Sequence, residues 1–219
     1  MSRRLLLLCG AASSVLYAAV NVAAPLTYPG YDVVSQAVSE LGALGAPTRT
    51  LMVVTGVVYN LLVLAFAWGV WRSAPANRPL RVVGALLAAF AVLGFGAPFM
   101  SMQQRGASFA LTDALHIAST ALTVLLMLLA IGFGAAALGP RFRVYSIVTL
   151  LVHAVFGAWA GADGPRLAAG LPTPSIGFTE RINIGAFMLW VAVLAATLMR
   201  SAAVRSGVAG GTARAPARA

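Results

Sequence analysis

Apolar residues dominate this chain in six long runs, and short polar segments separate each run from the next. About 20 helical residues cross roughly 30 Å of hydrocarbon, because each residue of an α-helix rises about 1.5 Å. The runs lack the alternation of polar and apolar positions that is typical of membrane barrel strands. A backbone in lipid must pair its own N–H and C=O groups, so the runs predict membrane-spanning helices. We expect these helices at residues 5–24, 51–71, 82–100, 111–138, 144–160 and 184–199.

The six spans predict one all-α membrane domain over residues 1–204, followed by a basic tail over 205–219 that we expect to be disordered. The run 5–24 follows Arg3 and Arg4, as the apolar part of a signal peptide would. Its length of about 20 residues instead favours a retained helix. Of the 219 residues, 60% are hydrophobic and only 9% are charged, whereas soluble domains carry about 25% charged residues. The lipid bilayer is therefore the expected environment of this chain.

The arginines divide unevenly between the two sides of the predicted bundle, and the chain has no lysine. Cytoplasmic segments of membrane proteins are enriched in basic residues, so the side with more arginines is predicted to be cytoplasmic. Both termini lie on that side, and all five acids lie on the other. The arginine-rich side contains Arg3, Arg4, Arg72, Arg78, Arg81, Arg141, Arg143, Arg200, Arg205, Arg214 and Arg218; the other side contains Arg49, Arg105, Arg166 and Arg181 with Asp32, Glu40, Asp113, Asp163 and Glu180.

Composition also narrows the class of protein and its location. The formal net charge of +10 does not indicate a nucleic-acid-binding protein, because the arginines lie between apolar runs rather than along one polar face. The abundance of Ala, Gly, Val, Leu and Arg is typical of a GC-rich bacterial genome, so we expect a multi-pass protein of a bacterial inner membrane. Cys9 is the single cysteine, which excludes an internal disulfide and a cysteine-based metal cluster.

A short amphipathic helix is predicted after the first span, at residues 33–41. Asp32 can cap its start, and Gly42 can end it in a left-handed conformation. Apolar residues share one face at helical spacing, and polar residues share the other. We expect this helix to lie in the headgroup layer with its polar face in water; the alternative is a lid whose polar side chains point into the bundle. The polar face consists of Ser35, Gln36, Ser39 and Glu40.

Ionisable residues also mark the outer starts of two later spans. Asp113 and His116 are three residues apart near the start of the fourth span, so they share one helix face. This spacing predicts either a general acid–base dyad or a helix cap beside an interfacial histidine. At the start of the sixth span, Thr179 is a natural cap, Glu180 suits the first turn, and Arg181 can pair with an acid or hold a lipid phosphate.

His153 lies midway along the fifth predicted span, where an ionisable side chain is rare and normally faces a partner or a watery cavity. The plainer alternative is a neutral histidine hydrogen-bonded to another helix. Candidate partners are Tyr59 and Asn60, which are expected near the membrane midplane on the second span. Counted from the span ends, His116 lies about 6 Å and His153 about 12 to 15 Å below the outer surface. We therefore predict a funnel that leads from the outer acids to His153.

The histidines also suggest a metal or haem site. Zinc would take His116 and His153 with Asp113 or Glu180 as a further ligand, and the difference in depth then requires a tilted or displaced helix. Haem held by both histidines meets the same mismatch in depth, and no redox motif supports it.

Several short motifs occur together along the chain, namely Tyr31-Asp32, Ser35, Ser39-Glu40-Leu41-Gly42, Pro47, His116, His153 and Glu180-Arg181. In a chain of six spans, this combination resembles the bacterial and archaeal membrane family catalogued as domain of unknown function 998, over roughly residues 4–200. The Ser-Glu-Leu-Gly segment is its most specific part. The resemblance implies a six-helix fold without an established activity. The resemblance also implies that the candidate site residues are the polar positions Ser39, Glu40, His116, His153, Glu180 and Arg181.

Three functions fit these features. The first is hydrolysis or group transfer on a lipid or small amphiphile at the outer face, with a looser resemblance to membrane zinc hydrolases of the ceramidase type, which use three histidines where this chain has two. The second is proton-linked transport or sensing through His153. The third is a non-catalytic scaffold in which small residues such as Gly132 and Gly134 allow close helix packing. The first function assigns catalysis to His116, His153, Asp113 and Glu180, and substrate binding to Ser39, Glu40, Arg181, Tyr59 and Asn60.

Overall fold

The structure is a computed structural model that describes residues 1–212, with side chains described as far as Ser201. Six of its helices are long and apolar enough to cross a membrane, which confirms the predicted all-α class and its six spans. The elements are α1 (Arg3–Leu26), η1 (Val38–Gly42), α2 (Arg49–Arg72), α3 (Arg78–Phe95), η2 (Ala97–Phe99), α4 (Leu111–Ala137), α5 (Pro140–Ala162), α6 (Gly164–Ala168) and α7 (Ile176–Thr212), where η denotes a 3-10 helix.

Local signals in the sequence set several helix ends. The side chain of Ser2 accepts a hydrogen bond from the N–H of Leu5 at the start of α1. Asn77 caps α3 in the same way, because its side-chain oxygen lies 3.0 Å from the N–H of Leu80. Pro79 occupies the first turn of α3, where its missing N–H costs no helical hydrogen bond. The turns between helices are therefore encoded locally.

The start of α7 differs from the span predicted at 184–199, because the helix already begins at Ile176. The polar residues Glu180 and Arg181 interrupt the apolar run in the sequence, but both bind the loop that follows α1. The helix therefore continues through them, and its first turns rise above the apolar part of the span.

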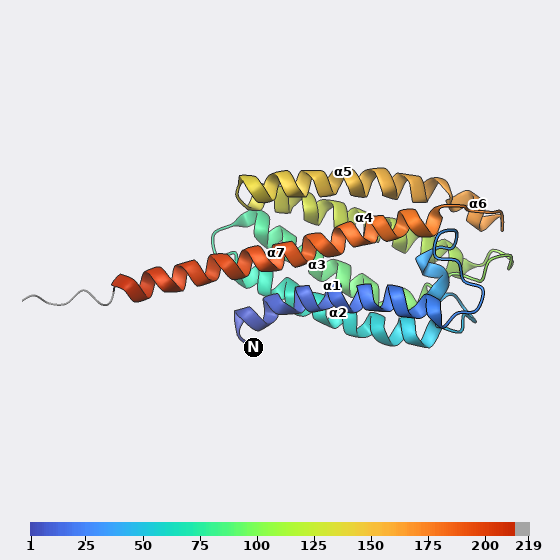
Figure 1. Ribbon diagram of the computed structural model, residues 1–219, viewed down its shortest axis with the longest axis horizontal. Coiled ribbons are helices and arrows are strands. Elements are labelled where there is room, and N and C mark those ends of the chain that lie inside the picture. The colour runs from blue at the N-terminus through green and yellow to red at the C-terminus, as the bar shows by residue number, and fades with distance from the viewer. Residues whose placement is uncertain (213–219) are drawn as a thin grey trace, which may run out of the picture.

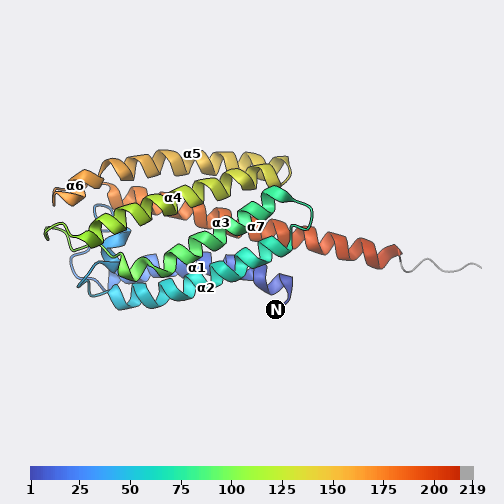
Figure 2. The same ribbon diagram turned by 180° about the vertical axis from the view of Figure 1, so that it is seen from behind.

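The six long helices run lengthwise beside one another (Figures 1 and 2), and their contacts close them into a ring. Neighbours in the chain pack together from α1 to α5, α5 packs against α7, and α7 closes the ring against α1. Short connections favour such antiparallel neighbours. The longer connections, residues 27–48, 96–110 and 163–175, gather at one end, which we call the loop end. The opposite end carries the turns 73–77 and 138–139, and we call it the arginine end.

Large apolar side chains fill the ring from its middle to the arginine end. Trp190 is fully buried there, together with Phe66 and Phe187. The buried residues of α4 fall only within 127–135, and those of α5 only within 142–153. The largest apolar cluster thus belongs to the arginine half of the bundle, whereas the loop half contains two smaller clusters, around Leu41 and around Met102, beside its polar contacts.

Two glycines let large rings enter this core. A Cβ atom at Gly10 would lie 2.6 Å from the ring of Phe66, and one at Gly134 would overlap the ring of Trp190. Neither position can accept a larger side chain without movement of its neighbour. Gly132, by contrast, has no neighbour within 4 Å of its Cβ position. Of the two glycines predicted to allow close helix packing, Gly134 therefore does so within this chain, by making room for the ring of Trp190.

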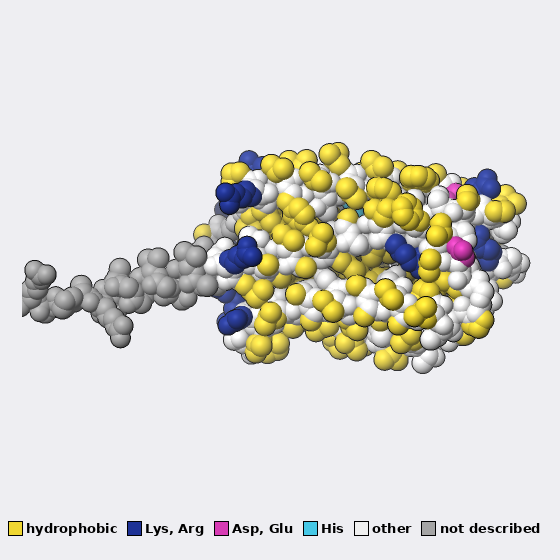
Figure 3. Space-filling view, viewed as in Figure 1, with side chains coloured by type: hydrophobic (Ala, Val, Ile, Leu, Met, Phe, Trp, Pro, Cys, Tyr) yellow, Lys and Arg dark blue, Asp and Glu magenta, His cyan; other side chains and the backbone are white. Residues whose placement is uncertain are grey.

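Charged side chains lie at the two ends of the bundle (Figure 3). All five acids belong to the loop end, whereas no acid lies at the arginine end within the described residues. This separation matches the predicted sorting of charge between two sides, and the cytoplasmic location of the arginine end stays a prediction. The described cations of the arginine end are Arg3, Arg4, Arg72, Arg78, Arg81, Arg141, Arg143 and Arg200.

The amphipathic α-helix predicted at 33–41 does not form. Turns occupy its first residues, and only η1 follows as a single 3-10 segment. Its backbone groups bind partners outside the segment: the N–H of Val38 donates to Glu180, and the carbonyl of Val34 accepts from the N–H of Phe178. Because these groups serve tertiary contacts, they are not available for a regular α-helical ladder.

The backbone of α7 is helical as far as Thr212, so it includes the first part of the tail predicted at 205–219. The side chains of that part and all of 213–219 lie outside the described residues. The expected disorder of the tail stays a prediction.

Candidate functional site

One arginine joins all three loops at the loop end. Arg105 forms an ion pair with Glu40 of η1, with 2.8 Å between Nη2 and Oε1. The same guanidinium donates to the hydroxyl of Thr173 at 2.9 Å and to the carbonyl of Leu171 at 3.0 Å. Arg105 thereby connects the segment after η2 with η1 and with the segment before α7.

The predicted interfacial helix places Glu40 on a face in contact with water. In the structure the side chain of Glu40 is instead buried, with only 4% of it exposed. Its carboxylate accepts hydrogen bonds from the N–H of Ala37 at 2.8 Å and from Arg105. Burial of a carboxylate is tolerable when a cation and N–H groups satisfy its oxygens. Ser39, the neighbouring candidate for substrate binding, is half-buried, and its hydroxyl forms no hydrogen bond to another described residue.

Two adjacent residues of α7 hold the same loop from the other side. Glu180 accepts a hydrogen bond from the N–H of Val38 at 2.6 Å. Arg181 donates to the carbonyl of Val33 at 2.8 Å and to the hydroxyl of Tyr31 at 3.0 Å, and its guanidinium lies 5.7 Å from the centre of the tyrosine ring. These contacts fasten the 27–48 segment to the start of α7, and they use the groups that were candidates for catalysis and for phosphate binding.

Two titratable groups outside the membrane spans are shifted by these surroundings. Burial raises the pKa of the Tyr31 hydroxyl above its usual range, although its hydrogen bond with Arg181 acts in the opposite direction. Hydrogen bonds from the backbone N–H groups of Ser35 and Val34 hold the pKa of Asp32 below its usual range. Tyr31 therefore stays protonated and donates to the carbonyl of Ala37 at 2.8 Å.

Asp113 and His116 are not hydrogen-bonded to each other within the described residues. The carboxylate of Asp113 accepts hydrogen bonds from the N–H of Ala110 at 2.9 Å and from the N–H of Gln103 at 2.8 Å, so it caps α4 and fixes the preceding loop. The Nδ1 atom of His116 lies 3.1 Å from the carbonyl oxygen of Met100. The observed geometry is the helix-cap alternative rather than an acid–base dyad.

His153 is fully buried at the interface of α5 and α7. Its Nδ1 atom lies 3.3 Å from the carbonyl oxygen of Asn183, and the side-chain amide of Asn183 donates to the carbonyl of His153 at 2.7 Å. A carbonyl oxygen can only accept, so Nδ1 carries the proton of the neutral ring. The buried Nε2 atom has no hydrogen-bond partner in the described structure, and its lone pair is left free. An unpaired buried acceptor of this kind is uncommon and calls for a functional or structural explanation.

Tyr59 and Asn60, the partners expected for His153, are buried on α2 and contact other residues. Tyr59 packs against Tyr17, with ring centres 5.1 Å apart, and the side-chain amide of Asn60 occupies the space that a Cβ atom at Gly94 of α3 would need. The reason is the order of the helices in the ring, in which α5 lies between α4 and α7 rather than next to α2. The partner of His153 is instead Asn183.

The residues proposed for zinc do not come together. The described part of the chain contains no group of three or more His, Cys, Asp or Glu side chains that could share one metal ion. His116 and His153 are anchored to different backbone segments, and the carboxylates of Asp113 and Glu180 each bind backbone N–H groups. The same anchoring argues against the pairing of both histidines on one haem.

Reasoning from the sequence missed three residues of these networks: Arg105, Thr173 and Asn183. Asn183 had a detectable signal, because it is a polar residue within an apolar run and lies three positions after Glu180, which places both on one side of α7. Arg105 and Thr173 had no such signal, since both occur in irregular loops whose approach to Glu40 depends on the fold.

The comparisons with known proteins give a family and no activity. No curated protein and no solved structure matches the chain. A family model described as "Protein of unknown function (DUF998)" matches residues 11–197, which include every candidate residue discussed above. This match covers most of the chain, from α1 into α7. The protein belongs to the DUF998 family of membrane proteins.

Proposed function

We propose that this protein is a proton-linked sensor or transporter of a small molecule, and that His153 is its proton-binding group. The observation that carries the proposal is the free Nε2 atom of a fully buried imidazole whose other nitrogen is anchored to the backbone of Asn183. A buried ionisable residue in the middle of a membrane span normally marks a proton or ligand pathway.

Protonation of His153 would change the contact between α5 and α7. The neutral ring has one N–H and satisfies it on Asn183. The imidazolium has a second N–H at Nε2, which needs an acceptor that the described packing does not provide. Either water, an anion or a polar ligand must then reach Nε2, or the two helices must shift. Proton uptake is thus coupled to opening of the α5–α7 interface.

The other titratable groups around α5 have separate partners or lie toward the ends of the bundle, and among them the hydroxyl of Tyr145 and one carboxylate oxygen of Asp163 are buried without a partner in the described structure. None of them forms a hydrogen bond with the imidazole of His153. On the packed neighbours α4, α6 and α7 these groups are Asp113, His116, Arg166, Glu180, Arg181 and Arg200, and on α5 itself and its C-cap they are Arg141, Arg143, Tyr145 and Asp163. His153 therefore titrates as an isolated group, without a neighbouring carboxylate to hold its proton.

The hydrolase alternative receives less support from the same geometry. A hydrolytic site needs a nucleophile or activated water beside a free acid or base. Glu40, Glu180 and Asp113 instead bind a cation or backbone N–H groups and hold loops in place. We assign these carboxylates a positioning role at the loop end.

The test is nuclear magnetic resonance of the protein labelled with nitrogen-15 in its histidine rings. The chain has two histidines, so a His116→Gln variant leaves His153 as the single signal. We expect a ring protonated only on Nδ1 at pH 8 and uptake of a second proton as the pH is lowered to about 5. We also expect the protection of the backbone amides of α5 and α7 against hydrogen exchange, corrected for the pH dependence of intrinsic exchange, to fall over the same pH range, and this fall to be absent in His153→Gln. A ring that stays neutral, or equal exchange with and without His153, would contradict the proposal.

A further inference from the structure

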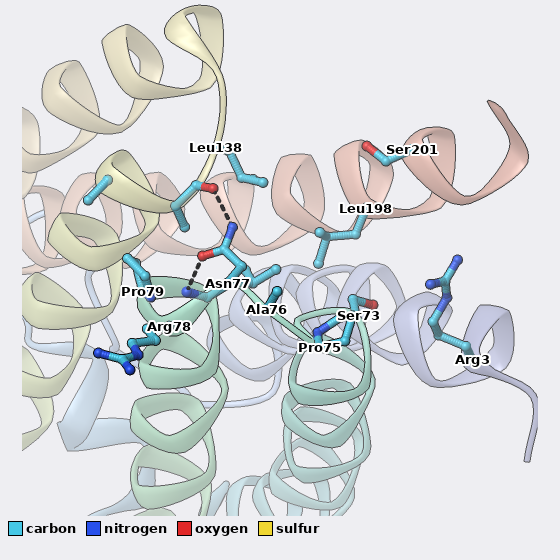
Figure 4. A pocket seen from close by; sticks show the side chains of 13 residues that line it. Arg3, Ser73, Pro75, Ala76, Asn77, Arg78, Pro79, Leu138, Leu198 and Ser201 are labelled. Carbon is cyan, nitrogen blue, oxygen red and sulfur yellow. Dashed lines mark hydrogen bonds between the residues drawn. The ribbon is translucent and has the colours of Figure 1, made fainter. Parts of the chain in front are cut away.

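A hollow of about 630 Å³ opens at the arginine end, away from His153 and from the loop network (Figure 4). The turn 73–77 and the start of α3 form one wall, and the ends of α4 and of the described part of α7 form the other. Arg3 reaches toward the hollow from the first turn of α1. The volume falls within the range of roughly 300 to 1,000 Å³ that is typical of small-molecule sites.

Side chains hold the walls of this hollow in place. Asn77 caps α3 and also donates a hydrogen bond to the carbonyl of Ala137 at 2.7 Å, which joins the α2–α3 turn to the end of α4. Arg81 donates to the carbonyls of Ala74 and Pro75 within the same turn. The hollow is therefore bounded by fastened segments rather than by a loose surface loop.

The hollow has the electrostatics of an anion site. Arg3 is half-buried and Arg78 is exposed, and neither guanidinium forms a hydrogen bond or ion pair with any described residue. Because the arginine end has no described acid, nothing nearby offsets these charges. A half-buried guanidinium beside a cavity matches phosphate, which it can bind through two parallel hydrogen bonds.

The apolar walls indicate what else the ligand carries. Leu80 and Leu198 are buried at 2% and 6% exposure, and both line the hollow together with Leu138. These residues lie where the membrane-spanning segments end, at the level expected for lipid headgroups. A ligand with a phosphate group and an adjoining acyl chain would fit both the cation and the apolar wall.

We propose that the hollow at the arginine end binds a phosphate group, as carried by an anionic phospholipid, with Arg3 as the principal contact. This site is independent of the proton-linked function proposed for His153.

The test measures the melting temperature of the purified full chain in neutral detergent with added phosphatidylglycerol, phosphatidylcholine or inorganic phosphate. We expect phosphatidylglycerol to raise the melting temperature at concentrations at which phosphatidylcholine has little effect. Arg3→Gln should weaken this response about tenfold in lipid concentration, because it removes a charge-assisted contact. Arg4→Gln is the matched control, because Arg4 is exposed, carries the same charge and does not line the hollow.

The results of this test either support the phosphate site and its lipid ligand or overturn one of them. A response to inorganic phosphate equal to that of phosphatidylglycerol would keep the phosphate site and overturn the lipid as its source. The site would be overturned if Arg3→Gln and Arg4→Gln weakened the melting-temperature response to phosphatidylglycerol equally. It would also be overturned if phosphatidylglycerol and phosphatidylcholine raised the melting temperature equally. If Arg3→Gln fails to fold, Ala76→Trp fills the hollow from an exposed position and should abolish the response, whereas Ala76→Ser should preserve it.

Discussion

The arginine half and the loop half of the bundle are stabilised by different interactions. In the arginine half, the rings of Trp190, Phe187 and Phe66 fill the space between helices, and glycines make room for them. In the loop half, the apolar clusters are smaller, and Arg105 and Arg181 bind loop carbonyls and side chains. Apolar packing responds to lost volume, whereas a polar network responds to loss of a charge or a donor. We therefore expect a substitution in one half to destabilise that half and to leave the other half largely unchanged.

The difference also separates two possible sites. The polar residues that appeared most suited to chemistry in the sequence are occupied at the loop end, where they keep three loops together. Two groups with unused bonding capacity, the Nε2 atom of His153 and the guanidinium of Arg3, lie outside that network. A costly polar residue in a membrane protein is thus a better functional candidate when its bonding is incomplete.

The largest expected effect is loss of the central ring in the arginine half. Trp190→Ala should lower the free energy of unfolding by about 3 kcal/mol, because it removes a fully buried ring and leaves a cavity beside Gly134. The change can be measured by reversible unfolding in mixed micelles with increasing denaturing detergent. Trp68→Ala is the matched control, because Trp68 is 55% exposed and should change stability little. Equal losses in the two variants would show that the apolar core does not stabilise this half.

The next effect tests the loop half. Arg105→Gln should lower the free energy of unfolding by about 2 kcal/mol, since it leaves the buried carboxylate of Glu40 without its cation. This loss is smaller than that for a fully buried ion pair, because the Arg105 side chain is 24% exposed. Limited proteolysis should cut the loop-end segments faster, while protection of the arginine half is unchanged.

The double variant Glu40→Gln/Arg105→Gln sharpens this test. It should regain part of the lost stability, because no buried charge is left unpaired. Arg166→Gln serves as the control at the same end, since the Arg166 side chain binds only the exposed carbonyl of Pro172. A double variant as unstable as the sum of the two single variants would show that the ion pair is not coupled.

The smallest effect is a local dependence on pH. The pKa of Asp32 is lowered in the folded protein, so its contribution to stability is present above the ordinary value of 3.8 and is lost as the pH falls through the lower folded value. The protection of the backbone N–H groups of Val34 and Ser35 against solvent exchange, corrected for the pH dependence of intrinsic exchange, should then fall at the acid end of this range. Asp32→Asn should remove this dependence. An unchanged acid response in Asp32→Asn would assign it to another group.

The sequence predicted the architecture well and the site only in part. Long apolar runs require helices in lipid, so the six spans and the separation of charge could be read directly. The rotation of each helix about its axis and its neighbours in the bundle cannot be read from the apolar runs, so the sequence points from His153 to Tyr59 and Asn60 rather than to Asn183. The 33–41 segment was misjudged because its polar groups bind α7 rather than water.

The sequence by itself determined that this is a six-span helical membrane protein whose acids and most of whose arginines lie at opposite ends, because the cost of unpaired backbone in lipid leaves few alternatives. Only the tertiary structure decided which polar groups are satisfied. That property depends on the order of helices in the ring and on how the loops fold back, since a hydrogen bond requires its two atoms within about 3 Å of each other. For this reason Glu40 is a structural anion and His153 keeps a free nitrogen, although both are costly polar residues in an apolar chain.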